Sequence, residues 1–444
     1  MVRRRQRRAR GAKRSWRVLL QWLVPLLLVL LTTRISLAQW DFTHAGDPKR
    51  NWGASATETV GYDDNFNGTE KNPQAGARIS SDVRLRANVP LERFFVGMQY
   101  DYGVVYPQDI KFGGVDETHN LNLSANCTIS PRLALNLTES FINSLQPELV
   151  QDVAGAPVTV LQAGTYIYDT VGVGLIYSVA PRWNVSVNGS WDIWEYQSSL
   201  IASNGNHQDY SATLSALYLL DTRTTVGLNY QYGQDVFVDA GPNNGLNAVS
   251  HTLYLSVVRR FNPRLSLSLN GGYTVRDSQD GTQSTSPSAY GSLVYNFGPA
   301  SAITLTLAQS LNEATLGVNR QFSAQQNTSF VVQISHRLTT RLRAIGDITY
   351  VYGSFTQPLG ATATTTGPIP VGGFGNPTPV GPPPGSTVSP NDQALTGHLG
   401  LNYAFRDWVS AVLDYSYTDL VSSDVLLIQP YTRNQINAGI SLTY

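Results

Sequence analysis

The sequence predicts an all-β fold: a transmembrane antiparallel up-and-down β-barrel of about 18 strands, or 16 if the two weakest do not form. Three observations support this prediction. From residue 52 onward, apolar and polar side chains alternate with the period of a strand rather than that of a helix. Short turns recur roughly every 40 residues and alternate with longer polar stretches. Charged residues make up only 14% of the 444 residues, well below the roughly 25% of typical soluble proteins.

The first 38 residues are typical of a secretory signal peptide. This segment holds ten of the 31 Lys and Arg residues and no Asp or Glu. An apolar run of about 14 residues, Val18 to Leu31, follows the basic stretch, and Ser36-Leu37-Ala38 supplies the small residues of a cleavage site. The alternative is an uncleaved signal anchor, but the run is shorter than the roughly 20 residues that span a bilayer. We therefore expect the mature chain to start at Gln39.

The composition of the mature chain excludes several classes of protein. Without residues 1–38 the chain has 21 basic and 31 acidic residues, a net charge of −10, which argues against nucleic-acid binding as a bulk property. No later segment approaches the 18 apolar residues of a transmembrane helix. The single Cys127 allows no intramolecular disulfide. We therefore expect residues 39–51 to be a periplasmic lead-in and residues 52–444 to be a barrel in the outer membrane of a Gram-negative-type cell.

The alternation is clearest in residues 120–129, where every odd position is apolar and every even position is Asn, Ser or Thr. Successive side chains of a strand point to opposite faces, so such a segment has one apolar and one polar face. The segments 79–89, 183–193, 265–275 and 409–417 alternate in the same way. A soluble sandwich also alternates, but its polar face is solvated and usually charged. Here the polar face is mostly Ser, Asn, Thr, Gly and Gln, which suits a hydrated interior.

The turns set the number of strands. Short turns recur at 90–93, 130–132, 180–182, 221–223, 262–264, 298–300, 339–341 and 406–407. An even strand count places both termini on the periplasmic side, with short periplasmic turns and longer external loops. The weakest strands are 52–62, where Glu58 falls on the apolar face, and 301–313. We expect strands at 52–62, 76–89, 94–106, 117–129, 133–143, 166–179, 183–196, 207–220, 225–236, 248–260, 265–276, 288–298, 301–313, 322–335, 341–353, 393–405, 408–419 and 432–444.

The expected loops differ in length and composition. Residues 354–391 hold nine prolines with many Gly and Thr, and Pro removes ladder donors, so this segment cannot be a strand. We expect it to be a long external loop; folding into the lumen as a constriction is the alternative. The other loops are expected at 63–75, 107–116, 144–165, 197–206, 237–247, 277–287, 314–320 and 420–431.

Pairs of tyrosines recur at the same end of alternate predicted strands. Ordinary β-propensity also enriches Tyr in strands. The repeated placement favours an interfacial girdle of the kind that flanks the apolar band of transmembrane barrels. The pairs are Tyr100 and Tyr102, Tyr230 and Tyr232, Tyr350 and Tyr352, and Tyr415 and Tyr417.

The last strand resembles the assembly signal of outer-membrane proteins. That signal is a polar residue, a glycine and two apolar positions that end in an aromatic; Asn437, Gly439, Leu442 and Tyr444 match it here. The alternative is an ordinary final strand that happens to end in Tyr. The resemblance implies recognition by the outer-membrane assembly machinery and insertion among outer-membrane lipids.

A second resemblance is carried by the run Tyr62-Asp63-Asp64-Asn65 after the first expected strand. It is similar to the first hairpin of the β-barrel porin 2 family, and the general pattern of that family covers residues 52–444. The resemblance implies an outer-membrane barrel, in some members encoded with exopolysaccharide systems, and leaves the solute unassigned. From the residues alone, Asp63, Asp64 and Asn65 fit a turn and a cation site equally well.

No motif in the sequence indicates an active site, a metal or a cofactor. There is no HExxH, CxxC, GxSxG or phosphate-binding loop. His207 with Asp209, and His251, fall near strand ends and could meet at the rim, as the facing residues of barrel hydrolases do. We do not expect the chain to be an enzyme, and no catalytic residue is assigned.

Charged residues on the expected lumen face are better candidates for function. Rings of charge tune which solutes pass a pore, whereas cross-strand pairing would give them a purely structural role. Three functions are weighed: a porin-like channel for small polar solutes or saccharides, a non-conducting structural or adhesive barrel whose external loops bind a partner, and a barrel hydrolase. The lumen candidates are Asp82, Arg84, Arg86, Asp101, Asp192, Arg343 and Asp347.

Overall fold

The computed structural model describes residues 51–65, 68, 70–107, 115–144, 149–151, 157–159, 165–197, 202, 205–238, 247–279, 281–313, 322–358, 391–422 and 430–444. The predicted signal peptide, nearly all of the lead-in and residues 359–390 of the expected external loop 354–391 lie outside these residues. Residues Ala45–Tyr444 form one compact unit. Within the described ranges, no helix is long and apolar enough to cross a membrane.

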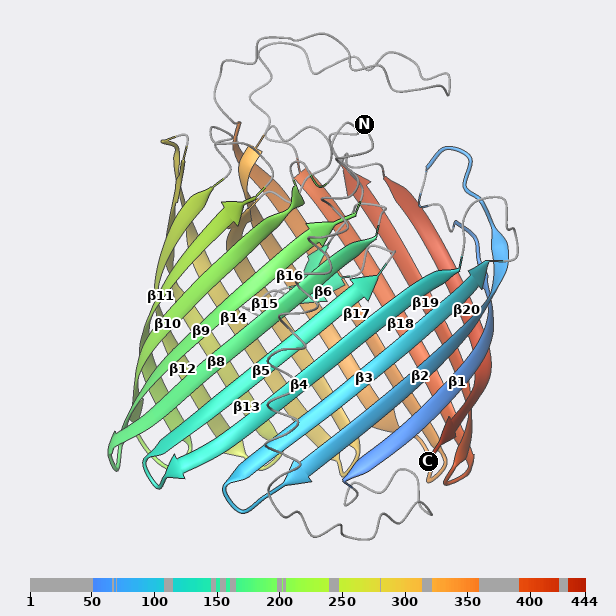
Figure 1. The fold of residues 1–444 in the computed structure, drawn as a ribbon, viewed down its shortest axis with the longest axis horizontal. Coiled ribbons are helices and arrows are strands. Elements are labelled where there is room, and N and C mark those ends of the chain that lie inside the picture. Colours follow the sequence, from blue (N-terminus) through green and yellow to red (C-terminus); the bar gives the residue numbers. More distant parts are fainter. Residues whose placement is uncertain are drawn as a thin grey trace, which may run out of the picture. The chain divides into compact units, whose positions relative to one another are not determined.

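Eighteen antiparallel strands form one closed sheet (Figure 1). Each strand pairs with its neighbours along the chain, and β1 also pairs with β20, which closes the barrel. The predicted fold class is therefore confirmed. The strands are β1 (Trp52–Asp63), β2 (Gly76–Pro90), β3 (Phe94–Pro107), β4 (Asp116–Ser130), β5 (Leu133–Ser144), β8 (Tyr166–Ala180), β9 (Trp183–Tyr196), β10 (His207–Leu219), β11 (Thr224–Phe237), β12 (Ala248–Asn262), β13 (Leu265–Ser278), β14 (Gln283–Gly298), β15 (Ser301–Glu313), β16 (Phe322–Arg337), β17 (Leu342–Pro358), β18 (Asn391–Arg406), β19 (Val409–Ser422) and β20 (Tyr431–Thr443).

Three predicted loops differ from the structure, one in its content and two in their bounds. The expected loop 144–165 contains a small hairpin, β6 (Leu149–Gln151) and β7 (Pro157–Thr159), outside the barrel sheet. The expected loop 277–287 is a tight turn, because β13 and β14 extend until Asp277 pairs with Gln283, and Gly281 takes a left-handed φ of 83°. The strand β17 runs to Pro358, since its ladder with β16 continues to that residue.

The barrel is inverted relative to a soluble protein. Most of its exposed large side chains are apolar, such as Leu255 at 59% exposure, while many of its buried ones are small and polar, such as Ser329 at 1%. Side chains on the concave wall crowd together, and those on the convex face splay apart. The alternating sequence therefore directs apolar side chains outward and hydroxyl and amide side chains inward, as lipid outside and water inside require.

Glu58 lies on the apolar convex face, as its register predicts. The Ser81 hydroxyl on the neighbouring strand donates a 2.6 Å hydrogen bond to Glu58 Oε2. This contact gives the carboxylate a polar partner on that face. The irregularity that weakened the prediction of strand 52–62 is thus a local pairing and not an error of register.

The four tyrosine pairs share one geometry on the convex face. In each pair the second tyrosine lies directly across from a polar residue of the next strand, and the first tyrosine's phenol hydrogen-bonds to that residue. The part of a strand between its short turn and the second tyrosine is about nine residues long, as from Phe94 to Tyr102 in β3. This length is close to that of a strand that spans a membrane. The phenol oxygens contact His119 Nδ1 (2.8 Å), His251 Nδ1 (2.8 Å), Gln393 Oε1 (3.2 Å) and Asn434 Oδ1 (2.8 Å).

The two ends of the barrel differ. Eight short turns join β2–β3, β4–β5 and their successors at one end, called the turn end here (Figure 1). The other connections, which are longer except for the tight β13–β14 turn, lie at the other end, the loop end. Five of the strands that enter these turns carry a register shift near their last residues, in β4, β8, β12, β14 and β18. Such bulges add local twist at barrel rims. At the β10–β11 turn, the Arg223 N–H donates to Asp221 Oδ1 at 2.6 Å and lowers the pKa of that carboxyl group.

Candidate pore lining and the seam that closes it

The register places all seven lumen candidates on the face opposite most of the exposed apolar residues. Asp82, for example, pairs with Thr57 and Gly103, whereas its neighbour Val83 pairs with Ala56 and Tyr102. The seven do not form one ring. They divide into a group on β2 and β3, a group on β17, and Asp192 alone on β9.

The group on β2 and β3 is held by one ion pair. Arg84 Nε contacts Asp101 Oδ1, and Gln99 Nε2 donates to Asp101 Oδ2 at 2.7 Å. Both the Arg84 and the Arg86 side chains remain exposed. Cross-strand pairing therefore accounts for Asp101, while the guanidinium of Arg84 still borders open space in the lumen.

The group on β17 includes two residues that sequence analysis missed. His398 on β18 lies between Asp347 of β17 and Asp414 of β19: its Nδ1 is 3.3 Å from Asp347 Oδ1, and its Nε2 is 3.4 Å from Asp414 Oδ1. Each of the three side chains is about one third exposed. Only the strand order brings them together, since Asp347 and Asp414 lie two strands apart. Arg343 instead donates to Ser335 Oγ.

Asp192 lies on the inner wall near the loop end, where it accepts a hydrogen bond from Thr170. Aromatic rings extend along the inner wall beside it: Tyr168 and Trp194 lie 4.3 Å apart between centroids, and His207 stacks on Trp194 at 5.8 Å. The idea that His207 and His251 meet at the rim is wrong. His207 lies on the inner face, 3.4 Å from Asp209, whereas His251 pairs with Tyr232 on the apolar face.

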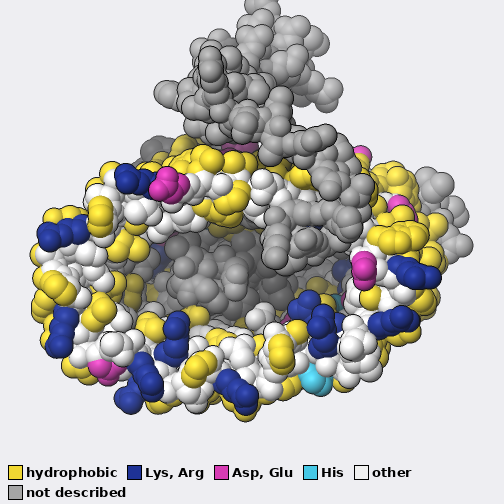
Figure 2. Space-filling view, turned by 90° about the horizontal axis from the view of Figure 1, so that it is seen from below, with side chains coloured by type: hydrophobic (Ala, Val, Ile, Leu, Met, Phe, Trp, Pro, Cys, Tyr) yellow, Lys and Arg dark blue, Asp and Glu magenta, His cyan; other side chains and the backbone are white. Residues whose placement is uncertain are grey.

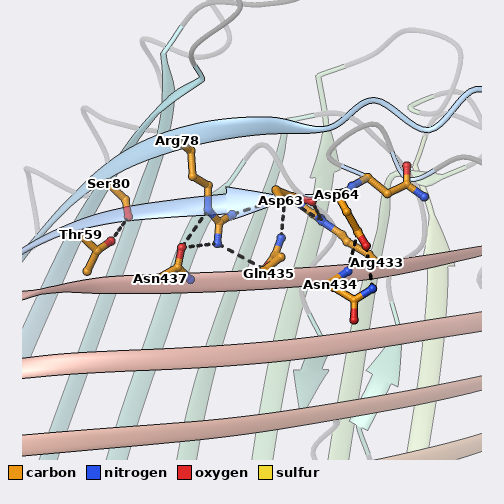
Figure 3. Close-up of polar contacts among 10 residues, drawn as sticks. Thr59, Asp63, Asp64, Arg78, Ser80, Arg433, Asn434, Gln435 and Asn437 are labelled. Carbon is orange, nitrogen blue, oxygen red and sulfur yellow. Dashed lines mark hydrogen bonds and ion pairs between the residues drawn. The ribbon is translucent and has the colours of Figure 1, made fainter.

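A buried polar cluster locks the seam between β1 and β20 (Figure 3). Asp63, 2% exposed, accepts hydrogen bonds from Arg433 Nε (3.0 Å) and Gln435 Nε2 (2.8 Å), and Arg78 Nη1 of β2 lies 3.7 Å away. Arg78 also donates to Asn437 Oδ1 at 3.1 Å. One carboxylate thus ties together the first two strands and the last.

The rest of the Asp63-Asp64-Asn65 run continues this lock past the end of the strand. Asp64 accepts hydrogen bonds from the Asn434 backbone N–H and from Asn434 Nδ2, both at 2.7 Å. Asn65 Nδ2 donates to the Thr432 carbonyl at 2.8 Å, and its N–H donates to Asp63 Oδ1. The hydrogen bond from Asn65 to Asp63 is the contact that a turn predicts, but most contacts of residues 63–65 are with β20. Within the described ranges, no group of three acidic, His or Cys side chains is arranged to hold a metal.

The residues of the predicted assembly signal also lie at the seam. Gly439 pairs with Thr59 of β1 and Val412 of β19, and a Cβ on it would lie 2.0 Å from the Glu58 carbonyl oxygen. The terminal Tyr444 exchanges two backbone hydrogen bonds with Ala54, and its ring lies 5.5 Å from that of Trp52. The final strand therefore closes the sheet to its last residue.

No family model matches the chain, and no curated protein matches it. The resemblance of residues 62–65 to the porin 2 family stays an expectation.

Solved structures of similar fold include outer-membrane proteins. The outer membrane protein OpdK from Pseudomonas aeruginosa matches with a TM-score of 0.42 and 13% identity, over 88% of this chain and 99% of OpdK. The siderophore receptor PirA from Pseudomonas aeruginosa matches at 0.39 and 10%, over 90% and 81%. The alcaligin outer membrane receptor FauA from Bordetella pertussis matches at 0.35 and 10%, over 90% and 76%. At this level of identity and superposition, these neighbours assign neither a solute nor a function.

Proposed function

We propose that this chain is an outer-membrane channel that passes small polar solutes. One observation carries the proposal: a closed sheet with an apolar convex face surrounds an inner wall of hydroxyl, amide and charged side chains. A barrel of 18 strands is in the size range of porins that hold an aqueous channel. Figure 2, viewed from the turn end, shows the hollow inside the rim. The outer membrane is the site that such a barrel fits.

The composition of the inner wall favours uncharged, hydroxyl-rich solutes. From β8 to β16, most inward positions are Ser, Thr, Asn, Gln or Gly, as in Ser286, Thr274 and Asn229. Such side chains exchange hydrogen bonds with hydroxyl groups without a charge preference. Saccharides, which are rich in hydroxyl groups, are therefore among the solutes that we propose the channel passes.

Conductance in planar bilayers tests the proposal. Purified mature chain should give steady steps whose current is proportional to voltage. A silent barrel that binds cells or a partner through its external loops would replace the channel by the adhesive alternative. Hydrolysis of lipid or peptide that is lost on changing His207 would replace it by the enzymatic one.

The charged groups of the lumen make a second prediction. We expect Arg84→Gln/Arg86→Gln/Arg343→Gln to shift the reversal potential in a salt gradient toward greater cation selectivity, because three exposed positive charges leave the wall. The matched variant Asp82→Asn/Asp101→Asn/Asp347→Asn should shift it the opposite way. Equal reversal potentials for both variants and the wild type would show that these residues do not border the ion path.

A further inference from the structure

Arginines recur at the turn end with a regularity that the channel does not explain. Seven of the eight short turns have an arginine in the turn or directly beside it, and one arginine per turn is counted here; the β16–β17 turn has a second, Arg337, and the β14–β15 turn alone has none. All seven side chains are exposed. Figure 2 shows basic side chains distributed around this rim. These turn-end arginines are Arg93, Arg132, Arg182, Arg223, Arg264, Arg341 and Arg406.

None of the turn-end arginines forms an ion pair within the described part of the chain. The contrast with the loop end is sharp. There, Arg276 and Arg433 are largely buried, and each pairs with an aspartate, Asp235 and Asp63. At the turn end the positive charges outnumber the carboxylates and are exposed, so they are available to a negatively charged partner outside the protein.

Six of the turn-end arginines directly precede the first residue of a strand, and Arg406 is the last residue of β18. Arg93, Arg182 and Arg264 each directly precede the first strand residue on the convex face, which is Phe94, Trp183 or Leu265. Trp408, two residues after Arg406, is 59% exposed. Aromatic side chains of this kind mark the headgroup level of a bilayer. The guanidinium of the residue just outside the strand is therefore expected at the depth of the lipid phosphates.

We propose that the turn-end arginines form a belt that binds the phosphates of anionic phospholipids in the leaflet at the turn end. The guanidinium is planar, remains charged and matches phosphate oxygens with two parallel hydrogen bonds. Basic residues beside a membrane span are attracted to anionic lipid. The belt fixes the depth of the barrel in that leaflet. It requires only that the barrel be embedded, so it stands whether or not the lumen conducts.

Quenching by brominated lipids tests the belt directly. The full barrel is reconstituted in phosphatidylcholine vesicles with a minor fraction of phosphatidylglycerol, and one of the two lipids is brominated at a time. The fluorescence of Trp183 and Trp408, isolated by difference from a Trp183→Phe/Trp408→Phe variant, reports the lipid beside the turn end. We expect a preference for phosphatidylglycerol of about threefold or more at low salt, decreasing as salt is added.

Two variants with the same change in net charge give the control. Arg132→Gln/Arg182→Gln/Arg264→Gln should bring the ratio of quenching by phosphatidylglycerol to quenching by phosphatidylcholine close to one. Arg84→Gln/Arg86→Gln/Arg343→Gln removes three positive charges from the inner wall and should leave it unchanged. Conductance, measured on the same preparations, reports the channel separately.

Two results would overturn the proposal. One is equal quenching by both brominated lipids in the wild type. If the turn-end arginines then bound polyglutamate in a salt-sensitive way, the partner would be an acidic macromolecule and not lipid. The other is a preference that the inner-wall variant removes as fully as the turn-end variant, because the lipid would then respond to overall charge and not to the belt.

Discussion

Gly439→Val should prevent the barrel from closing. A Cβ at this position would lie 2.0 Å from the Glu58 carbonyl oxygen and 2.8 Å from Thr59 Cα, both of them backbone atoms of β1. Backbone cannot move away as a flexible side chain can, so the β1–β20 ladder must separate. We expect a loss of more than about 4 kcal/mol in the free energy of unfolding, at the extreme of single substitutions. The folded band of unheated samples on a detergent gel should disappear.

Gly271→Val is the matched control. Gly271 lies on the apolar face of β13, and a Cβ there meets no atom within 4 Å. This variant should fold and migrate like the wild type. If Gly439→Val also migrates as a folded barrel with wild-type strand content, the close approach of β1 and β20 does not hold in the protein.

Asp63→Asn should have the second largest effect. The carboxylate is buried and faces Arg433 and Arg78, so its neutralisation leaves two guanidinium groups without their shared counter-charge. Removal of one partner from a buried pair typically costs about 3–5 kcal/mol. Urea unfolding in lipid vesicles measures this loss. The double variant Asp63→Asn/Arg433→Gln should be less destabilised than the sum of the two single variants, since the cycle isolates their interaction.

Asp101→Asn provides the comparison for Asp63. It breaks the Arg84–Asp101 pair, in which the arginine is 59% exposed. An exposed pair contributes up to about 1 kcal/mol. Equal losses for Asp63→Asn and Asp101→Asn would show that the seam cluster does not stabilise closure.

The sequence predicts what is local in this fold. Every barrel strand follows from the alternation of apolar and polar residues, because period two directly encodes the two faces of a strand. Short turns predict the hairpins, because a connection of a few residues can join only neighbouring antiparallel strands. Glu58 lies on the apolar face that its register predicts. Its hydrogen-bond partner, Ser81, could not be predicted from the sequence and is seen only in the structure.

What the sequence does not predict depends on contacts between distant residues. Closure requires that β1 meet β20, but Asp63 and Arg433 lie 370 residues apart, and no local pattern sets the register that joins them. The same holds for His398 between Asp347 and Asp414. The run Asp63-Asp64-Asn65 was visible as a turn or a cation site, and its contacts with β20 emerge only once the sheet is closed.

Cysteine accessibility along one strand tests the central claim most directly. In a Cys127→Ser background, single cysteines replace Ser266, Leu267, Ser268, Leu269 and Asn270 of β13, and a water-soluble maleimide is applied to barrels in lipid vesicles. The structure predicts rapid labelling at positions 266, 268 and 270 and protection at 267 and 269, because the first set lines a wet lumen and the second contacts lipid. Uniform labelling, or labelling of the opposite set, would contradict it.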